Sequence, residues 1–288
     1  MSSAAAGRLG GMRILVDNLA FPESPRWDGD RLLVSDWGAG EVVAVDSNGT
    51  REIVACLDSF PMCIDRLPDG RLLLVSSADR ALLRQEVDGS LVRHSDLSAL
   101  AQHPWNEIVV DGRGRAYVNN IGFDFPAGDF APGIVALVAP DGSARRVADG
   151  LAFPNGMVVT PDDSTLIVAE SYGNRLTAFD VAADGSLSNR RTWADLPGGY
   201  PDGICLDAEN AVWYADVPNR CCVRVREGGE VLDTIRVDRG CFACALGGED
   251  GRTLFLVANE WAGRESMAQS RAGQVLVARA PAPAPARL

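Results

Sequence analysis

A pattern of an aromatic residue, a proline and one variable residue recurs along the chain and constrains its fold more than any other feature. Its clear copies are Phe21-Pro22-Glu23, Phe60-Pro61-Met62, Phe153-Pro154-Asn155 and Tyr200-Pro201-Asp202, and its looser copies are Pro104-Trp105-Asn106 and Phe242-Ala243-Cys244. The last residues of successive copies lie 39 to 49 residues apart. A spacing of this size indicates a repeated structural unit.

Each copy is followed by the same succession of short apolar runs and turns. In one unit, Met157 to Val159 precedes a Pro-Asp-Asp turn and a second apolar run, Leu166 to Val168. Asp-Gly turns join the corresponding runs at 28–29, 69–70, 111–112 and 250–251, and apolar runs joined in this way form hairpins. A third run and usually a fourth complete each unit. The sequence therefore predicts an all-β, six-bladed β-propeller with four antiparallel strands per blade.

The ends of the chain indicate how the ring closes. The last unit has only three apolar runs, while Arg13 to Val16 forms an additional run before the first unit. We expect this N-terminal strand to complete the last blade and hide its edge. The predicted organisation is a flexible N-terminus at 1–12, a single propeller domain at 13–280, and a flexible Pro/Ala tail at 281–288 outside the fold.

The amino-acid composition limits the kinds of partner that the protein can bind. The net charge is -12, and the sequence contains no lysine; an acidic chain without a basic patch is a poor candidate for binding nucleic acid or anionic membrane. No apolar run approaches the roughly 20 residues of a membrane span, and residues 1–12 lack the apolar core of a signal peptide. We expect a cytoplasmic protein that acts on a small molecule.

Cysteine and histidine usage argues against two familiar kinds of site. The seven cysteines are scattered, and the Cys241-Phe-Ala-Cys244 spacing lacks the second separated pair of a zinc site. They are interpreted as buried core thiols. Only two histidines occur, and there is no Gly-x-Ser-x-Gly motif, so a nucleophilic triad is not favoured.

The innermost strands of a propeller surround a central channel, so the residues that begin them face one another. Here those residues are Glu23, Met62, Asn106, Asn155, Asp202 and Cys244. Carboxylates that face one another need a cation or shared protons. Oxygen ligands of this kind favour one divalent ion, Ca²⁺ first, with Mg²⁺, Mn²⁺ or Zn²⁺ as alternatives, although zinc would find only Cys244 among its preferred ligands. The other interpretation is that these polar residues cap strand ends and bind channel water.

Further residues are predicted to form the walls of a substrate pocket on the same face. They end returning strands or lie in the loop 121–132, a candidate lid or pocket wall: Trp37, Asn120, Phe123, Tyr172 and Trp261. His103 lies beside the site and could assist acid–base chemistry. For each of these residues the alternative is ordinary packing or a place in a surface loop.

Four motifs resemble those of the senescence-marker-protein/gluconolactonase family, the regucalcin-like six-bladed propellers. They are Glu23-Ser24-Pro25-Arg26-Trp27, Trp105-Asn106-Glu107-Ile108-Val109-Val110-Asp111, Pro154-Asn155-Gly156-Met157 and Pro201-Asp202-Gly203-Ile204-Cys205-Leu206-Asp207. The resemblance covers roughly residues 13–280. It implies one divalent cation held by Glu23, Asn155 and Asp202, with Asn106 on the substrate or at a fourth ligand position. It also implies lactone hydrolysis.

One departure from the family pattern concerns the substrate. Sugar-lactone members place an arginine two residues before the asparagine that matches Asn106, and here that position is Pro104, between His103 and Trp105. A proline cannot donate the hydrogen bonds of an arginine, and an aromatic neighbour favours an apolar or planar substrate. Trp105 is therefore included among the predicted substrate contacts.

The predicted function is a metal-dependent lactonase or carboxylic ester hydrolase in which Asp202 acts as the general base on water. Two other classes stay open. One is a different metal-dependent reaction on the same scaffold, such as phosphotriester hydrolysis or a step in small-molecule biosynthesis. The other is a non-catalytic propeller that binds a metal or a partner.

Overall fold

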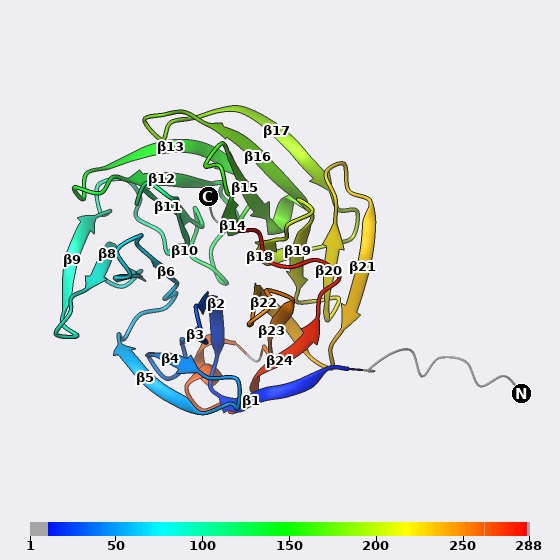
Figure 1. Ribbon diagram of the computed structural model, residues 1–288. Helices are drawn as coiled ribbons and strands as arrows, with labels where there is room; N and C mark the ends of the chain where they lie inside the picture. Colours follow the sequence, from blue (N-terminus) through cyan, green and yellow to red (C-terminus); the bar gives the residue numbers. More distant parts are fainter. Residues whose placement is uncertain (1–10, 262, 287–288) are drawn as a thin grey trace, which may run out of the picture.

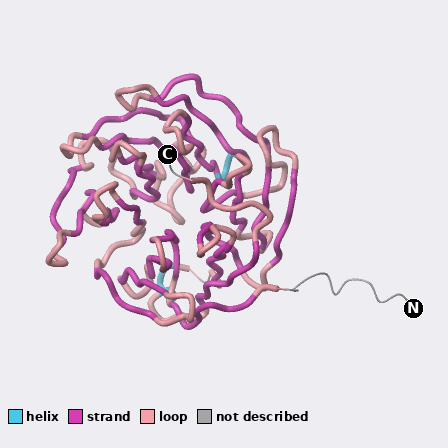
Figure 2. Tube along the Cα trace, viewed as in Figure 1, coloured by secondary structure: helices cyan, strands magenta, loops and turns pink. Residues whose placement is uncertain are grey.

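The computed structural model describes residues 11–261 and 263–286, which form six four-stranded antiparallel sheets arranged in a ring (Figure 1). Figure 2 shows that strands and loops make up nearly all of the ring. The strands β2, β6, β10, β14, β18 and β22 lie innermost and surround the centre (Figure 1). The predicted all-β, six-bladed propeller is confirmed.

In the first five blades the strands run outward from the centre in chain order. Blades one and two contain β2 (Pro22–Asp28), β3 (Arg31–Asp36), β4 (Glu41–Val45) and β5 (Arg51–Cys56), then β6 (Ile64–Arg66), β7 (Leu72–Ser76), β8 (Ala81–Gln85) and β9 (Leu91–Asp96). Blades three and four contain β10 (Trp105–Val110), β11 (Ala116–Asn120), β12 (Gly133–Val138) and β13 (Ala144–Leu151), then β14 (Pro154–Val159), β15 (Thr165–Glu170), β16 (Arg175–Val181) and β17 (Leu187–Asp195). Blade five contains β18 (Pro201–Leu206), β19 (Val212–Asp216), β20 (Cys221–Val225) and β21 (Val231–Arg236).

Blade six joins the two ends of the chain. It contains β22 (Gly240–Gly247), β23 (Thr253–Asn259) and β24 (Gly273–Arg279), and its outer strand is β1 (Arg13–Leu19). The first and last strands pair antiparallel, with Arg13 opposite Val277 and Ile14 opposite Leu276. The N-terminal strand therefore covers the edge that the last blade would otherwise expose, as predicted.

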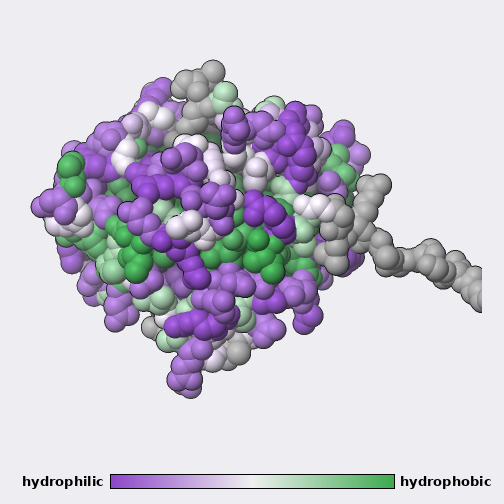
Figure 3. Space-filling model, turned by 60° about the horizontal axis from the view of Figure 1, so that its bottom comes forward, coloured by the Kyte–Doolittle hydropathy of each residue, from purple (hydrophilic) through white to green (hydrophobic). Residues whose placement is uncertain are grey.

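The hydrophobic core lies between neighbouring blades. The middle strands are apolar on both faces because each sheet packs against a sheet on either side; Leu33 and Val34 of β3, for example, have no exposed surface. Trp105 of blade three packs with Leu73 and Leu82 of blade two in one such layer. The outer surface in Figure 3 is mostly hydrophilic, with smaller apolar patches. Packing between blades thus fixes where each innermost strand begins.

A β-bulge at the start of the innermost strands determines where their side chains point. In β2, three steps from Glu23 to Arg26 oppose only two steps on β3, from Ser35 to Leu33. The same single extra residue occurs in β10, β14, β18 and β22. A bulge breaks the regular alternation of a strand and re-aims nearby side chains. The bulge lies beside Glu23, Asn106, Asn155 and Asp202 in their strands.

The C-terminal segment differs from the prediction. Its residues 281–286 lie against the turns on the face where the inner strands end. The Ala208 N–H donates to the carbonyl of Pro283 (2.8 Å), and the Ala284 N–H donates to the carbonyl of Gly251 (2.8 Å). Ala282 is fully buried. The expectation that this segment lies outside the fold is wrong for 281–286, because an extended Pro/Ala chain keeps carbonyls free to accept from the turns.

Most of the predicted flexible N-terminus, 1–10, lies outside the described residues. Within 11–261 and 263–286, no helix is long and apolar enough to cross a membrane; the two short helices are η1 (Ser171–Gly173) and α1 (Arg264–Met267).

The inner strands β14 and β18 approach each other closely at Gly156, and this contact can be tested by substitution. A Cβ at Gly156 would lie 2.5 Å from the carbonyl oxygen of Asp202 and 2.5 Å from the amide nitrogen of Ile204. We expect Gly156→Ala to lower the free energy of unfolding in urea by about 1–3 kcal/mol, since overpacking forces a backbone shift. Gly112→Ala is the matched control, because its Cβ would meet only the movable carboxylate of Asp163. Equal stability of the two variants would contradict the close approach.

Candidate active site

A cavity of about 300 Å³ opens on the face of the ring where the inner strands begin. Four of these strands each contribute one oxygen-bearing side chain to it: Glu23 from β2, Asn106 from β10, Asn155 from β14 and Asp202 from β18. We call these four residues the acidic floor. The structure brings together these four of the six residues expected to face one another, and the volume suits a small molecule.

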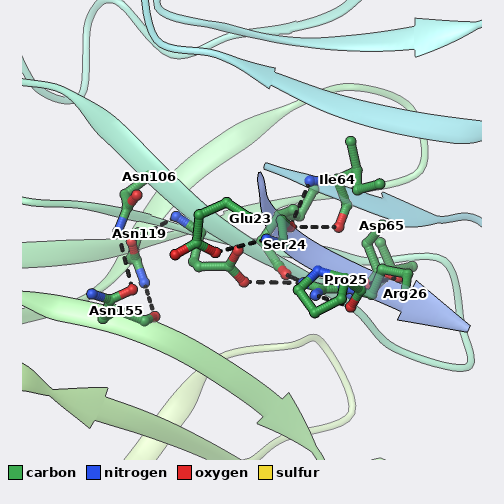
Figure 4. A network of polar contacts seen from close by, with 12 residues as sticks. Glu23, Ser24, Pro25, Arg26, Ile64, Asp65, Asn106, Asn119 and Asn155 are labelled. Atoms are coloured by element: carbon green, nitrogen blue, oxygen red, sulfur yellow. Dashed lines mark hydrogen bonds and ion pairs between the residues drawn. The ribbon is translucent and has the colours of Figure 1, made fainter. Parts of the chain in front are cut away.

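Hydrogen bonds hold the carboxamides of the acidic floor in place. The Asn106 Nδ2 donates to Asn155 Oδ1 (3.5 Å), and the Asn155 Nδ2 donates to Ser171 Oγ (3.3 Å). Asn119 donates from Nδ2 to the main-chain carbonyl of Asn155 (2.6 Å). Glu23 lies beside these carboxamides in Figure 4, and its Oε2 accepts the N–H of the following residue (2.7 Å).

An ion network missed by the sequence analysis lies on the other side of Glu23 (Figure 4). Arg26 donates to Glu107 Oε2 (3.0 Å) and to the carbonyl of Ile108 (2.8 Å), and its Nε is 3.7 Å from Asp65 Oδ1. Glu107 Oε1 is buried and has no hydrogen-bond partner in the described part of the chain. Arg26 and Glu107 belong to the same motifs as Glu23 and Asn106, which was the available signal.

The two carboxyl groups of the acidic floor resist ionisation. Burial raises the pKa of Glu23 to about 8, and the negative charge of Glu107 adds to this shift. Burial also raises the pKa of Asp202 well above its usual range, with the charge of Glu23 as the next cause. Both effects penalise the charged form. A cation between these groups would favour their ionised forms.

The donor set fits a hard divalent cation. The acidic floor offers only carboxylate and carboxamide oxygens, and the described residues that line the cavity include no lysine, arginine or histidine. Such oxygen ligands suit Ca²⁺ or Mg²⁺. Among the residues that the structure describes, no three His, Cys, Asp or Glu side chains are grouped to hold a metal ion. A metal centre here therefore depends on the carboxamides as well as on Glu23 and Asp202.

The aromatic residues of the repeated pattern also face the cavity, and buried acids hold them there. Asp36 Oδ1 accepts the N–H of Phe21 (2.6 Å), and Asp216 Oδ2 accepts the N–H of Tyr200 (3.0 Å). In blade four, Glu170 Oε2 accepts the N–H of Ala152, the residue before Phe153 (2.6 Å). The sequence analysis missed these acids, although each one ends the second strand of its blade.

Three of the predicted wall residues line the cavity, namely Trp37, Tyr172 and Trp261. Two other predicted contacts do not reach it. Trp105 is fully buried in the core between blades two and three. Phe123 is buried in a cluster with Ile121, Phe153 and Phe125, and of the loop phenylalanines it is Phe125 that lines the cavity. Loop 121–132 is therefore a cavity wall, and its movement as a lid stays a prediction.

The remaining predicted residues are placed outside the cavity wall. Asn120 is buried and braces its own loop: Nδ2 donates to the carbonyl of His103, and Oδ1 accepts the Gly122 N–H (3.0 Å). His103 lies in an adjacent polar groove, with Nδ1 3.0 Å from Asp124 Oδ1. These positions do not match the expected substrate contacts.

Two residues predicted to begin inner strands do not line the cavity, and neither begins its strand: Met62 precedes β6, and Cys244 lies within β22. Met62 is buried in the core of blades one and two. Cys244 packs its Sγ 3.6 Å from the Sγ of Cys205. The residues that gather in the cavity from the six starts are thus the four oxygen donors.

Fold and cavity together define a six-bladed propeller with an oxygen-donor site at one end of its channel. The sequence profile described as "SMP-30/Gluconolactonase/LRE-like region" matches residues 21–260. The chain belongs to this family.

Three curated relatives illustrate its range. Regucalcin from Danio rerio is 24% identical over 219 residues, covering 74% of this chain and 71% of the relative. Pentonolactonase from Haloferax volcanii is 27% identical over 252 residues, covering 85% and 83%. Diisopropyl-fluorophosphatase from Loligo vulgaris is 24% identical over 204 residues, covering 62% and 63%.

Solved structures with the same fold include a regucalcin from Agrobacterium tumefaciens, described as a calcium-binding protein. It superimposes with a TM-score of 0.76 at 19% identity, over 97% of this chain and 98% of that one. A gluconolactonase from Xanthomonas campestris gives a TM-score of 0.74 at 22% identity, over 93% and 89%. At these identities the likeness concerns the fold.

The raised pKa of Glu23 predicts how the metal-free protein responds to pH. Its pKa is about 8 in the folded state against an ordinary value of 4.5. The folded state therefore binds more protons between these values, so the free energy of unfolding falls as pH rises from 4.5 to 8. We expect Glu23→Gln to flatten this fall and to be more stable than the wild type at pH 8.

Urea denaturation with a chelator at pH 4.5, 6 and 8 measures this effect. Glu52→Gln serves as the control, because that carboxylate is largely exposed on an outer strand. A decline of equal steepness in wild type and Glu23→Gln would show that Glu23 is not the group responsible.

Proposed function

We propose that the protein is a divalent-metal-dependent hydrolase of lactones or related carboxylic esters. The observation that carries this proposal is the acidic floor: two carboxylates and two carboxamides gathered in a cavity whose other lining residues are mostly apolar. Family membership and the lactonases among its relatives support the reaction class.

The residues of the acidic floor divide into two roles. Glu23, Asn155 and Asp202 hold the ion, with Ca²⁺ first on the basis of the oxygen donors. When bound, the ion supplies Lewis-acid stabilisation of negative charge on a carbonyl oxygen. Asn106 is held by Asn155 and directs its amide toward the substrate or the attacking water.

Asp202 is the proposed general base. It is ionised once positive charge balances Glu23, and its carboxylate then accepts a proton from water as the water attacks the carbonyl carbon. The surrounding apolar walls limit competing water and lower the local dielectric, which strengthens each electrostatic contact.

A second candidate function is phosphotriester hydrolysis. It is favoured by the similarity to diisopropyl-fluorophosphatase, because the same oxygen donors could serve a phosphoryl oxygen. The non-catalytic alternative is metal binding alone, and it is supported by the likeness to a regucalcin described as calcium-binding.

A reconstitution experiment tests these functions. Chelated protein is loaded separately with Ca²⁺, Mn²⁺, Mg²⁺ and Zn²⁺ and assayed on lactones, aryl esters and a fluorophosphate triester. We expect lactone or ester hydrolysis to return with one ion. At saturating metal, Asp202→Asn is expected to lower kcat by about 10²- to 10⁴-fold, the usual contribution of a general base.

Asp88→Asn is the matched control, since that aspartate lies exposed in a turn of an outer hairpin. Selective hydrolysis of the phosphotriester would favour the second function. Tight metal binding, measured by calorimetry, without turnover of any substrate would favour the non-catalytic class.

A further inference from the structure

Two aromatic walls rise on opposite sides of the acidic floor. On the side of blades one and six, Phe21 stacks on Trp37 with ring centroids 5.7 Å apart, and its edge meets Trp261 at 5.6 Å. On the side of blades three and four, Phe153 stacks on Tyr172 at 4.8 Å and meets Phe125 at 5.1 Å. All six residues line the cavity. The space between the walls is thus bounded by ring faces and edges.

Two loops bring these walls together. Phe125, from the loop after β11, and Trp261, from the segment after β23, have ring centroids 6.1 Å apart and an interplanar angle of 35°. They come from blades three and six, which are far apart along the chain. Both rings line the same cavity as the acidic floor, so a ligand that fills this cavity contacts them.

Two polar groups of the lining outside the acidic floor are occupied by other contacts. Trp37 Nε1 donates to the carbonyl of Met62 (2.6 Å), and Ser171 Oγ donates to the carbonyl of Pro201 (2.7 Å). No lysine, arginine or histidine is found among the described residues of the lining. A sugar lactone would therefore find no basic donor here, and each hydroxyl group that it buries without a partner costs about 1–3 kcal/mol. The cavity therefore disfavours polyhydroxylated substrates.

The charges around the cavity also limit the net charge of a substrate. An anionic ligand would find no basic side chain in the described lining to balance its charge. A cationic ligand could be attracted by the aromatic faces, but the divalent ion required by the proposed function offsets the charge of the acidic floor. A neutral ligand needs no balancing charge from the lining. The aromatic walls stabilise a planar apolar group on such a ligand by stacking and burial.

We propose that this site takes a neutral lactone or ester carrying a planar aromatic or compact apolar group, which binds between the two walls with its carbonyl toward the acidic floor. This inference rests on the proposed hydrolase function and specifies its substrate class. Phe125 and Trp261 are the specificity-determining residues that it adds.

Two lactones of equal ring size test the proposal. Dihydrocoumarin and glucono-δ-lactone are both six-membered lactones, and only the second carries hydroxyl groups. With each rate divided by that of spontaneous hydrolysis, we expect kcat/KM of the metal-loaded protein to be at least tenfold higher for dihydrocoumarin. The opposite preference would overturn the substrate class while leaving the lactonase proposal intact.

If neither lactone is hydrolysed, the hydrolase proposal fails and binding decides the substrate class separately. The probes are two lactams that resist hydrolysis, 3,4-dihydroquinolin-2-one and gluconolactam, followed by quenching of tryptophan fluorescence. Selective binding of the aromatic lactam supports the substrate class. Absence of binding, or selective binding of gluconolactam, overturns it.

Matched variants of one loop test the residue assignment. Phe125→Ala removes a ring of the lining, whereas Phe130→Ala removes an exposed ring of the same loop that is not part of the lining. We expect Phe125→Ala to lower kcat/KM for dihydrocoumarin about tenfold and to leave the value for glucono-δ-lactone within twofold. Phe130→Ala should change neither value by more than twofold. Equal losses on both lactones would assign Phe125 a merely structural role.

Trp261→Ala gives an independent variant on blade six, should loop 121–132 fail to fold without Phe125. The expected result is the same selective loss. Neutrality is tested with 3,3-dimethylbutyl acetate and acetylcholine, two esters of nearly equal shape that differ in charge. A preference for acetylcholine would overturn the neutral class.

Discussion

The burial of two carboxyl groups in one cavity is the constraint on which the rest of the site depends. Glu23 and Asp202 come from different blades, and both have a raised pKa because low-dielectric surroundings penalise their charged forms. The charge of Arg26 offsets only part of this shift for Glu23, and the hydrogen bonds of Arg26 go to Glu107 and to two main-chain carbonyls. The acidic floor is therefore a place where positive charge is strongly favoured. Carboxamides complete it without adding further repulsion.

The propeller can tolerate two buried carboxyl groups because its stability comes from contacts outside the acidic floor. Apolar layers between blades and the pairing of β1 with β24 fix the ring, while the bulged starts of the inner strands are free to carry polar side chains. Gly156 permits β14 and β18 to approach closely beside Asn155 and Asp202. Repulsion at the acidic floor is thus balanced by packing that does not involve it. Structural and chemical roles are separated along each inner strand.

The sequence predicted the site residues that recur at equivalent positions of the repeat. It did not predict side-chain directions and loop paths, which depend on the local conformation of the backbone. The repeat located Glu23, Asn106, Asn155 and Asp202 because each is the second residue of its inner strand, but the same spacing placed Met62 before β6 and Cys244 inside β22. Trp105 precedes Asn106 but does not line the cavity: it packs in the core between blades two and three, whereas Asn106 lies in the bulge of β10 and reaches the cavity. Loop 121–132 has no periodicity, and only its folded path decides which phenylalanine reaches the cavity. The Pro/Ala tail shows the same limit, because composition does not reveal which turns can donate to it.

The aromatic walls and the acidic floor form one electrostatic system. Apolar rings around the carboxylates lower the effective dielectric, which raises the cost of unbalanced charge and also strengthens the attraction of a bound cation. The same rings remove the donors that a hydroxylated substrate would need. A wall of arginine or lysine would bind such a substrate, but it would compete with a metal for Glu23 and Asp202. The absence of basic side chains from the described lining therefore favours metal binding and an apolar ligand together.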